Sequence, residues 1–196
     1  MGQITVVKNL DNIEGLCLIT PKVHGDKRGY FTETYSARDM KEAGLDILFV
    51  QDNQSMSSKG VLRGLHFQKK YAQTKLVRVI KGKVFDVAVD IRPGSPTYGK
   101  WHGEILSEEN HRQFLIPKGF AHGFLVLSDT AEFCYKCDDF YHPDDEGGIV
   151  WNDPDIGIEW PEIKKELYNG SEIYTLDGRK LNLSEKDLAW PGIKEI

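Results

Sequence analysis

A two-residue alternation between positions 84 and 91 constrains the fold more than any other feature of this chain. Its apolar face carries Phe85, Val87, Val89 and Ile91, and its more polar face carries Val84, Asp86, Ala88 and Asp90. Side chains that alternate in this way describe a β-strand, because successive residues of a strand point to opposite sides of a sheet. The segment therefore predicts a strand with one apolar face and one more polar face.

Similar short segments precede and follow this strand, and turn-like residues separate them. The predicted strands are 76–80, 112–116, 123–127 and 131–137. The clearest helical segment is 37–45, which Ser36 caps and Gly44 ends. The series predicts an all-β fold, an antiparallel sandwich or barrel with few helices.

The length of 196 residues suits one domain. We expect a single domain over 1–196, with a core at about 21–161 and a C-terminal extension at 162–196. Within the extension, 162–167 is predicted to form a short helix. Residues 173–176 and 179–183 are predicted to form a hairpin around Asp177-Gly178.

Composition and charge exclude several classes of protein. The net charge of −5 disfavours a nucleic-acid binder that works through overall charge. No apolar run approaches the roughly 20 residues of a membrane span, and Met1–Thr5 lacks the pattern of a secretory signal. We therefore expect a cytoplasmic protein without a membrane or nucleic-acid partner. Three cysteines fit a reducing compartment, although Cys134 and Cys137 leave a redox or zinc role as a minor alternative.

Two histidines have settings that suggest chemistry. His66 is a polar residue inside an apolar, strand-like run, and His122 follows a turn. A lone histidine on a strand is more often a hydrogen-bonded core residue than a catalyst. Arg63 and His66 have opposite parity in a regular strand, so both enter one cavity only if the chain bulges, for which Gly64 is a suitable place.

A metal site is one interpretation of these histidines. The segment from Pro117 to His122 resembles the second motif of metal-binding cupins. The first motif requires His-x-His followed by Glu, whereas this chain has Gln68 and then Lys75. Two imidazoles without a third ligand fall short of ordinary zinc or iron sites, so we expect no metal.

An imidazole, a phenol and an ammonium group suit proton abstraction next to a carbonyl. A neutral histidine such as His66 can accept a carbon-bound proton near neutral pH. Lys75 can stabilise the enolate oxygen, and Tyr135 can return a proton to the opposite face. On spacing alone, packing roles for Tyr135 and Lys75 are equally compatible with the sequence.

Several ordered segments resemble the dTDP-4-dehydrorhamnose 3,5-epimerase family. The resemblance runs from about 21 to 161, resumes at 183–187, and is carried by Gly60–Gln68, Lys75–Val79, Phe85–Arg92 and Ile116–Phe124, with Gly25–Phe31, Phe49–Asn53, Trp151–Pro154 and Ile158–Pro161.

The resemblance implies a cupin-like jelly roll that is a homodimer and needs no metal or organic cofactor. It implies inversion of C3 and C5 of a dTDP-linked 4-keto-6-deoxyhexose on the route to rhamnose. By resemblance the catalytic residues are His66 as base, Tyr135 as proton donor, Asp187 as partner of His66, and Lys75 facing the C4 oxygen. The implied substrate-binding residues are Arg28, Glu33, Gln51, Asp52, Asn53, Arg63, Lys75, His122, Tyr141, Glu146 and Lys186.

Three other functions compete with this one. An epimerase of the same scaffold can invert only C5 or only C3. A non-catalytic sugar-nucleotide-binding module would keep the binding residues but have no use for His66 with Tyr135. A metal-dependent cupin oxygenase would need a metal.

The segment 162–182 is longer than the family pattern suggests. If this segment redirects the chain, Lys186 and Asp187 do not reach His66.

Overall fold

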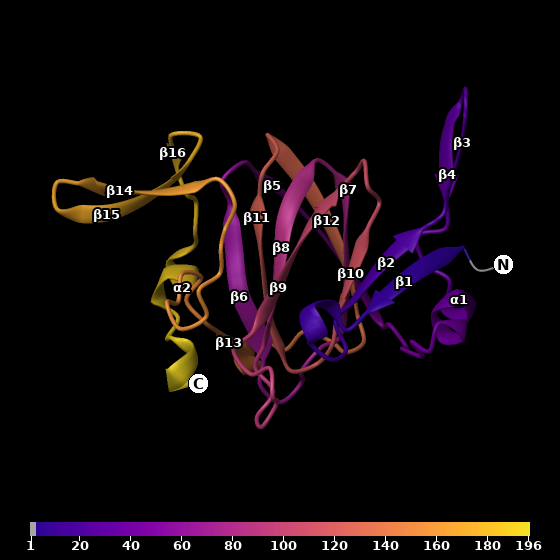
Figure 1. Ribbon diagram of the computed structural model, residues 1–196, viewed down its shortest axis with the longest axis horizontal. Coiled ribbons are helices and arrows are strands. Elements are labelled where there is room, and N and C mark those ends of the chain that lie inside the picture. Colours follow the sequence, from indigo (N-terminus) through magenta and orange to yellow (C-terminus); the bar gives the residue numbers. More distant parts are fainter. Residues whose placement is uncertain (1–2) are drawn as a thin grey trace.

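The computed structural model describes residues 3–196 and consists mainly of β-strands in two antiparallel sheets that face each other (Figure 1). The six-stranded sheet has the order β1-β2-β10-β7-β12-β5, formed by Ile4–Lys8, Cys17–Pro21, Gln113–Ile116, Lys75–Lys81, Thr130–Cys137 and Gln51–Ser58. The five-stranded sheet has the order β13-β6-β11-β8-β9, formed by Glu146–Gly148, Leu62–Gln68, Phe120–Val126, Lys83–Asp90 and Trp101–Ser107. The predicted all-β, jelly-roll class is confirmed.

The remaining elements are small. Two more strands, β3 (Val23–Asp26) and β4 (Gly29–Thr32), pair as a hairpin. The helix α1 (Ala37–Glu42) begins where predicted, and the Ser36 hydroxyl accepts a hydrogen bond from the Asp39 amide at its N-terminus. The other elements are α2 (Glu185–Ala189), β14 (Ile163–Tyr168), β15 (Ser171–Leu176), β16 (Arg179–Lys180) and the 3-10 turns Leu10–Asn12, Pro143–Asp145 and Ile193–Glu195. Among residues 3–196, no helix is long and apolar enough to cross a membrane.

The main core fills the space between the sheets. Phe124 and Phe133 stack there with ring centroids 4.3 Å apart, and Tyr135 packs against the edge of the same cluster. These side chains come from β11 and β12, one strand from each sheet. Phe133 and Tyr135 lie two residues apart on β12 and so share a face, which directs the side chain of Tyr135 between the sheets.

The strand predicted at 84–91 is β8, and its more polar face points inward, between the two sheets. Val84 and Ala88 belong to the main core, and Asp86 between them is fully buried. The apolar side chains Val87 and Val89 belong to a second cluster on the outer face of the five-stranded sheet. Both faces of the strand are therefore covered, and the polar one borders the interior where His122 lies.

The C-terminal extension supplies the cover for that second face. Its buried side chains Leu176, Leu181 and Ile193 pack there against the sheet, together with Trp151 and Trp160 from the segment just before it. The buried side chains of this segment therefore share one cluster with the five-stranded sheet.

The predicted helix at 162–167 is wrong. Residues 163–168 form β14, which pairs with β15 around the two-residue turn Asn169-Gly170. Both turn residues have positive φ values, 50° and 80°, as a tight primed turn requires. The hairpin predicted around Asp177-Gly178 is confirmed as β15 and β16.

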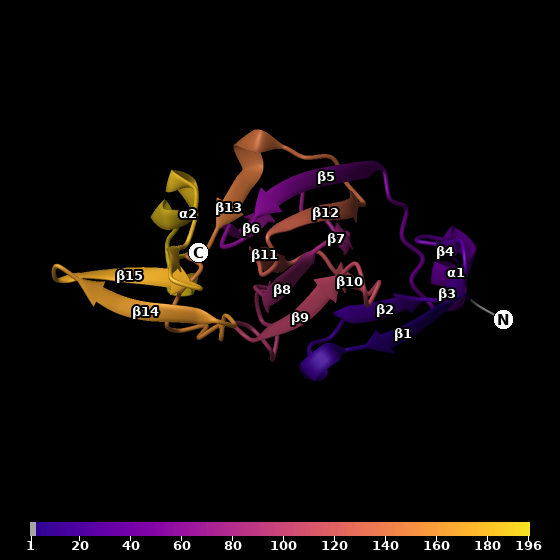
Figure 2. The same ribbon diagram turned by 90° about the horizontal axis from the view of Figure 1, so that it is seen from above.

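Two hairpins project from the sheets at opposite ends of the molecule. Figures 1 and 2 both show β14 and β15 on the side of α2, and β3 with β4 at the far side near α1. Arg28 lies in the turn between β3 and β4. This separation matters for the site, because Arg28 is one of the expected substrate-binding residues.

Candidate active site

A cleft of about 480 Å³ lies between β6 and the C-terminal extension. It is lined by Val61, Leu62, Arg63, His66, Asn182, Leu183, Ser184, Lys186 and Asp187. The long segment before α2 does not carry Asp187 and Lys186 away from His66. Backbone hydrogen bonds explain this result, because the Leu62 amide donates to the Asn182 carbonyl and the Asn182 amide donates to Gly60.

A bulge in β6 brings Arg63 and His66 to the same cleft. Arg63 is paired with Phe124 and His66 with His122, so two residues of β6 face the single residue Gly123 of β11. Gly64 has φ of +117°, and a Cβ there would lie 2.6 Å from the Gly123 Cα. Only glycine fits this position without moving the neighbouring strand. The predicted bulge is therefore present and corrects the parity of the two side chains.

His66 and Asp187 form a hydrogen-bonded pair in the cleft. The His66 Nε2 lies 2.5 Å from the Asp187 Oδ1, and the carboxylate is almost fully buried. Burial alone would raise the pKa of Asp187, but hydrogen bonds from His66 and Ser184 lower it below its ordinary value. An ionised Asp187 requires a hydrogen on Nε2, which leaves Nδ1 as the nitrogen that can accept a proton.

The wall behind His66 is aromatic. The Trp190 ring lies edge-on to the imidazole, with centroids 6.4 Å apart, and it covers Gly148. A Cβ at Gly148 would lie 2.3 Å from the indole. Since Gly148 is paired with His66 across β13 and β6, this contact fixes the end of α2 beside the histidine.

A second buried pair lies in the interior. The His122 Nε2 is 3.0 Å from both carboxylate oxygens of Asp86. His122 and Lys75 line one small cavity under β7 and β11. Burial lowers the pKa of Lys75, and the nearby carboxylates of Asp86 and Glu146 oppose that effect. Asp86 is not among the predicted site residues, although a carboxylate flanked by Val84 and Ala88 on one face of this strand was a signal available in the sequence.

Tyr135 points from β12 into the same interior. Its ring packs against Phe133, with centroids 6.0 Å apart. Burial raises the pKa of its phenol, and the positive charge of Arg63 opposes that rise. Tyr135 is therefore a protonated phenol at neutral pH whose surroundings include Arg63, the residue that also lines the His66 cleft.

Five of the expected binding residues lie in one chain of contacts. The Tyr141 amide donates to Gln51 Oε1, and Gln51 Nε2 donates to Asn53 Oδ1. The Tyr141 hydroxyl lies 3.5 Å from Glu146 Oε2, to which Lys186 Nζ donates at 2.7 Å. These contacts link β5, the loop before β13, and α2. The aromatic ring of Tyr141 is about half exposed beside them.

Three expected residues lie elsewhere in this chain. Asp52 lies on the outer face of β5, where it pairs with Lys136 at 2.9 Å, because it alternates with Gln51 and Asn53. Arg28 pairs with Asp26 in the projecting hairpin, and the exposed Glu33 follows that hairpin. The structure does not bring Arg28, Glu33 or Asp52 to the His66 cleft of the same chain.

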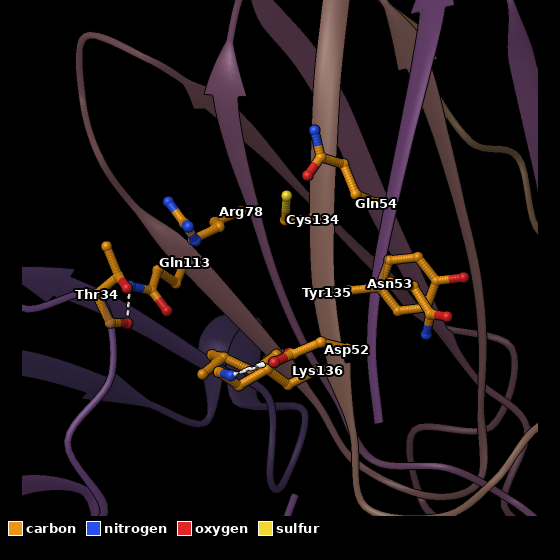
Figure 3. Close-up of a pocket in the computed structure, with 10 residues that line it drawn as sticks. Thr34, Asp52, Asn53, Gln54, Arg78, Gln113, Cys134, Tyr135 and Lys136 are labelled. Carbon is orange, nitrogen blue, oxygen red and sulfur yellow. Dashed lines mark hydrogen bonds and ion pairs between the residues drawn. The ribbon is translucent and has the colours of Figure 1, made fainter. Parts of the chain in front are cut away.

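The outer face of the six-stranded sheet has its own pocket of about 340 Å³. Figure 3 shows the side chains of Tyr135 and Asn53 pointing away from Arg78, Gln113 and Cys134, which gather on the outer side. Cys134 lines this pocket, whereas Cys137 is buried in the interior. Both thiols are free, and as residues three apart on one strand they point to opposite faces.

The described residues 3–196 contain no group of three or more His, Cys, Asp or Glu side chains arranged to hold a metal ion. In the cleft and the adjoining interior these residues place an imidazole oriented by a buried carboxylate, a protonated phenol, a partly buried lysine and an arginine. This set provides a base, an acid and donors for a developing oxyanion.

Comparison with known proteins supports one family. The model of the family described as dTDP-4-dehydrorhamnose 3,5-epimerase matches residues 11–195. A relative of that name from Methanothermobacter thermautotrophicus is 51% identical over 196 residues, 100% of this chain and 97% of its own.

Two solved structures show the same fold. An epimerase from Legionella pneumophila in complex with dTDP-4-keto-L-rhamnose superposes with a TM-score of 0.87 and 49% identity, covering 98% of this chain and 94% of its own. A 3'-monoepimerase from Streptomyces bikiniensis in complex with dTDP-quinovose has a TM-score of 0.80 and 30% identity, covering 99% and 88%. From the family match and the full-length relative, this chain belongs to the dTDP-4-dehydrorhamnose 3,5-epimerase family.

Proposed function

We propose that the protein inverts C3 and C5 of dTDP-4-dehydro-6-deoxy-D-glucose and produces dTDP-4-dehydro-L-rhamnose. The observation that carries the proposal is the His66–Asp187 pair, which lies in one cleft with Arg63 while Tyr135 lies in the adjoining interior. An imidazole held by a buried carboxylate is the arrangement that a base near neutral pH requires.

Each inversion breaks and re-forms one C–H bond. His66 accepts the proton through Nδ1, and the electron pair of the C–H bond forms the double bond of an enolate. The negative charge moves to the C4 oxygen, where the ammonium group of Lys75 stabilises it. Tyr135 then gives a proton to the opposite face of the carbon. Nothing is oxidised or reduced: the imidazolium of His66 releases its extra proton to solvent, and solvent returns a proton to the phenolate of Tyr135.

Binding follows from the residues at the mouth of the cleft. Arg63 and Lys186 are cations that suit phosphate oxygens. Their local attraction for the diphosphate outweighs its repulsion by the protein's net charge of −5. Tyr141 offers an exposed ring for the thymine, and Gln51 and Asn53 offer amides for its polar edge. His122 and Glu146 contact the sugar.

Incubation with substrate in deuterium oxide tests this function. We expect deuterium at both C3 and C5, because each carbon loses its proton to a base that exchanges with solvent. Mass spectrometry and proton NMR count and locate the labels. One label would instead indicate a single-centre epimerase, the activity named for the Streptomyces relative, and no label with retained dTDP binding would indicate a binding module.

We further propose that the active form is a homodimer in which a second copy supplies Arg28 and Glu33. Two observations support this. The hairpin that precedes Glu33 and carries Arg28 projects at the end of the molecule opposite α2, the helix whose Lys186 and Asp187 line the cleft (Figures 1 and 2). Its Tyr30 and Phe31 are 63% and 66% exposed, a large apolar surface for a free hairpin.

Subunit mixing tests the dimer. Arg28→Ala and His66→Ala chains are refolded together, so that a hybrid dimer has one site with His66 from one copy and Arg28 from the other. At limiting substrate we expect activity to return to roughly a quarter of wild type, as random pairing of a two-fold dimer gives. A mixture of His66→Ala with Tyr135→Phe is the control and should stay inactive. Equal results for both mixtures would reject the shared site.

A further inference from the structure

The second oxygen of Asp187 has a partner to which the sequence analysis gave no role. Its Oδ1 faces His66 Nε2, and its Oδ2 accepts a hydrogen bond from the Ser184 hydroxyl at 2.8 Å. Asp187 is 3% exposed, so water does not compete with these two partners for the carboxylate oxygens. One hydrogen bond on each oxygen fixes the rotation of the carboxylate about its bond to Cβ.

The direction of the Ser184 hydrogen bond is settled by a second contact. The Ser184 Oγ also accepts from the backbone amide of Asp187 at 3.1 Å, as the N-terminal cap of α2. A hydroxyl has one hydrogen, and the amide already supplies its own. The hydroxyl hydrogen is thus available to the carboxylate alone, which makes Ser184 a donor to an ionised Asp187.

The position of Ser184 is itself held by the sheet. Asn182, two residues earlier, is bonded through its backbone to Leu62 and Gly60, on either side of the parallel bridge to Val61. Three residues along the chain from Val61, β6 bulges at Gly64, and His66 follows the bulge. Base and carboxylate are therefore positioned from the same strand, the base directly and the carboxylate through Ser184.

We propose that Ser184 is a positioning residue of the His66–Asp187 pair: its hydroxyl holds Oδ2 so that Oδ1 faces His66 Nε2 throughout proton transfer. The inference rests on the proposed epimerase function. When His66 becomes an imidazolium, Asp187 must keep its negative charge and its direction. A hydrogen bond to Oδ2 stabilises the negative charge and holds the direction of the carboxylate, and it does so without contact with the reacting carbon.

Three variants separate this role from helix capping. Ser184→Gly removes the hydroxyl, and glycine remains an acceptable N-cap. Ser184→Thr retains the hydroxyl. Ser184→Asp is a good cap that has no hydrogen to donate at neutral pH. We expect kcat for exchange at C3 and C5 to fall about ten- to a hundredfold in the Gly and Asp variants, with KM within about twofold, and to be restored within about threefold by Thr.

A double-mutant cycle shows whether Ser184 acts through Asp187. In an Asp187→Asn background, we expect Ser184→Gly to reduce exchange by less than about twofold, because the carboxylate it holds is gone. An equal loss in both backgrounds would overturn the proposal, as would full activity of the Asp variant or of the Gly variant. A wild-type protein without any exchange would instead reject the epimerase function itself, so the two failures are distinguishable.

Discussion

Replacement of His66 by alanine is expected to stop hydrogen exchange at both C3 and C5. A general base contributes about 10²–10⁴ to a rate, and the proposed base is the imidazole that Asp187 orients in the cleft. The loss should fall on kcat, because the proposed contacts of Arg63 and Tyr141 with the nucleotide remain. Deuterium incorporation, measured by NMR over a long incubation, reports the effect at each carbon separately.

The control for this variant addresses Asp187, which loses its partner. His66→Asn keeps an N–H donor for the carboxylate but supplies no base. It should be as inactive as the alanine variant, with thermal stability closer to wild type. Binding of thymidine diphosphate to both variants shows that the cleft is intact. Wild-type exchange at either carbon in the alanine variant would remove His66 from the mechanism at that carbon.

Replacement of Tyr135 by phenylalanine is expected to separate proton loss from inversion. The phenyl ring keeps its packing against Phe133, so only the hydroxyl is lost. His66 still removes the proton and, after exchange with solvent, returns a deuteron to the same face. We therefore expect labelled substrate of unchanged configuration, while formation of the epimer falls about a hundredfold.

The measurement for Tyr135→Phe compares two rates in one reaction. Mass spectrometry gives total deuterium, and NMR coupling constants give the configuration at C3 and C5. The wild-type phenol stays protonated across neutral pH because burial raises its pKa, so the comparison needs no special pH. Unchanged formation of the epimer would mean that another group protonates the opposite face.

The two-residue alternation predicted where the strand at 84–91 lies, but not which of its faces points inward. The inward face carries Asp86 because an interior histidine, His122, satisfies that carboxylate, and the outer face is apolar because the extension covers it. Such an arrangement depends on tertiary partners that are remote in sequence.

The sequence carries a local signal for a hairpin where a helix was predicted at 162–167. The charged run before Leu167 suits an exposed helix and an exposed strand equally, but Asn169-Gly170 is a hairpin dipeptide. For the site, resemblance placed His66 with Asp187 in agreement with the contact found. Alternation along β5 separates Asp52 from Gln51 and Asn53, and the same rule was available from the sequence.

The late position of Asp187 in the chain has a consequence for how the enzyme is made. Synthesis proceeds from the N-terminus, so the sheet that holds His66 emerges from the ribosome before the carboxylate that orients it. While the segment that carries Asp187 is still inside the exit tunnel, the nascent chain contains His66 without its partner. The pair therefore forms only once α2 has emerged and packed beside β6, and chains that terminate before Ser184 lack the carboxylate altogether.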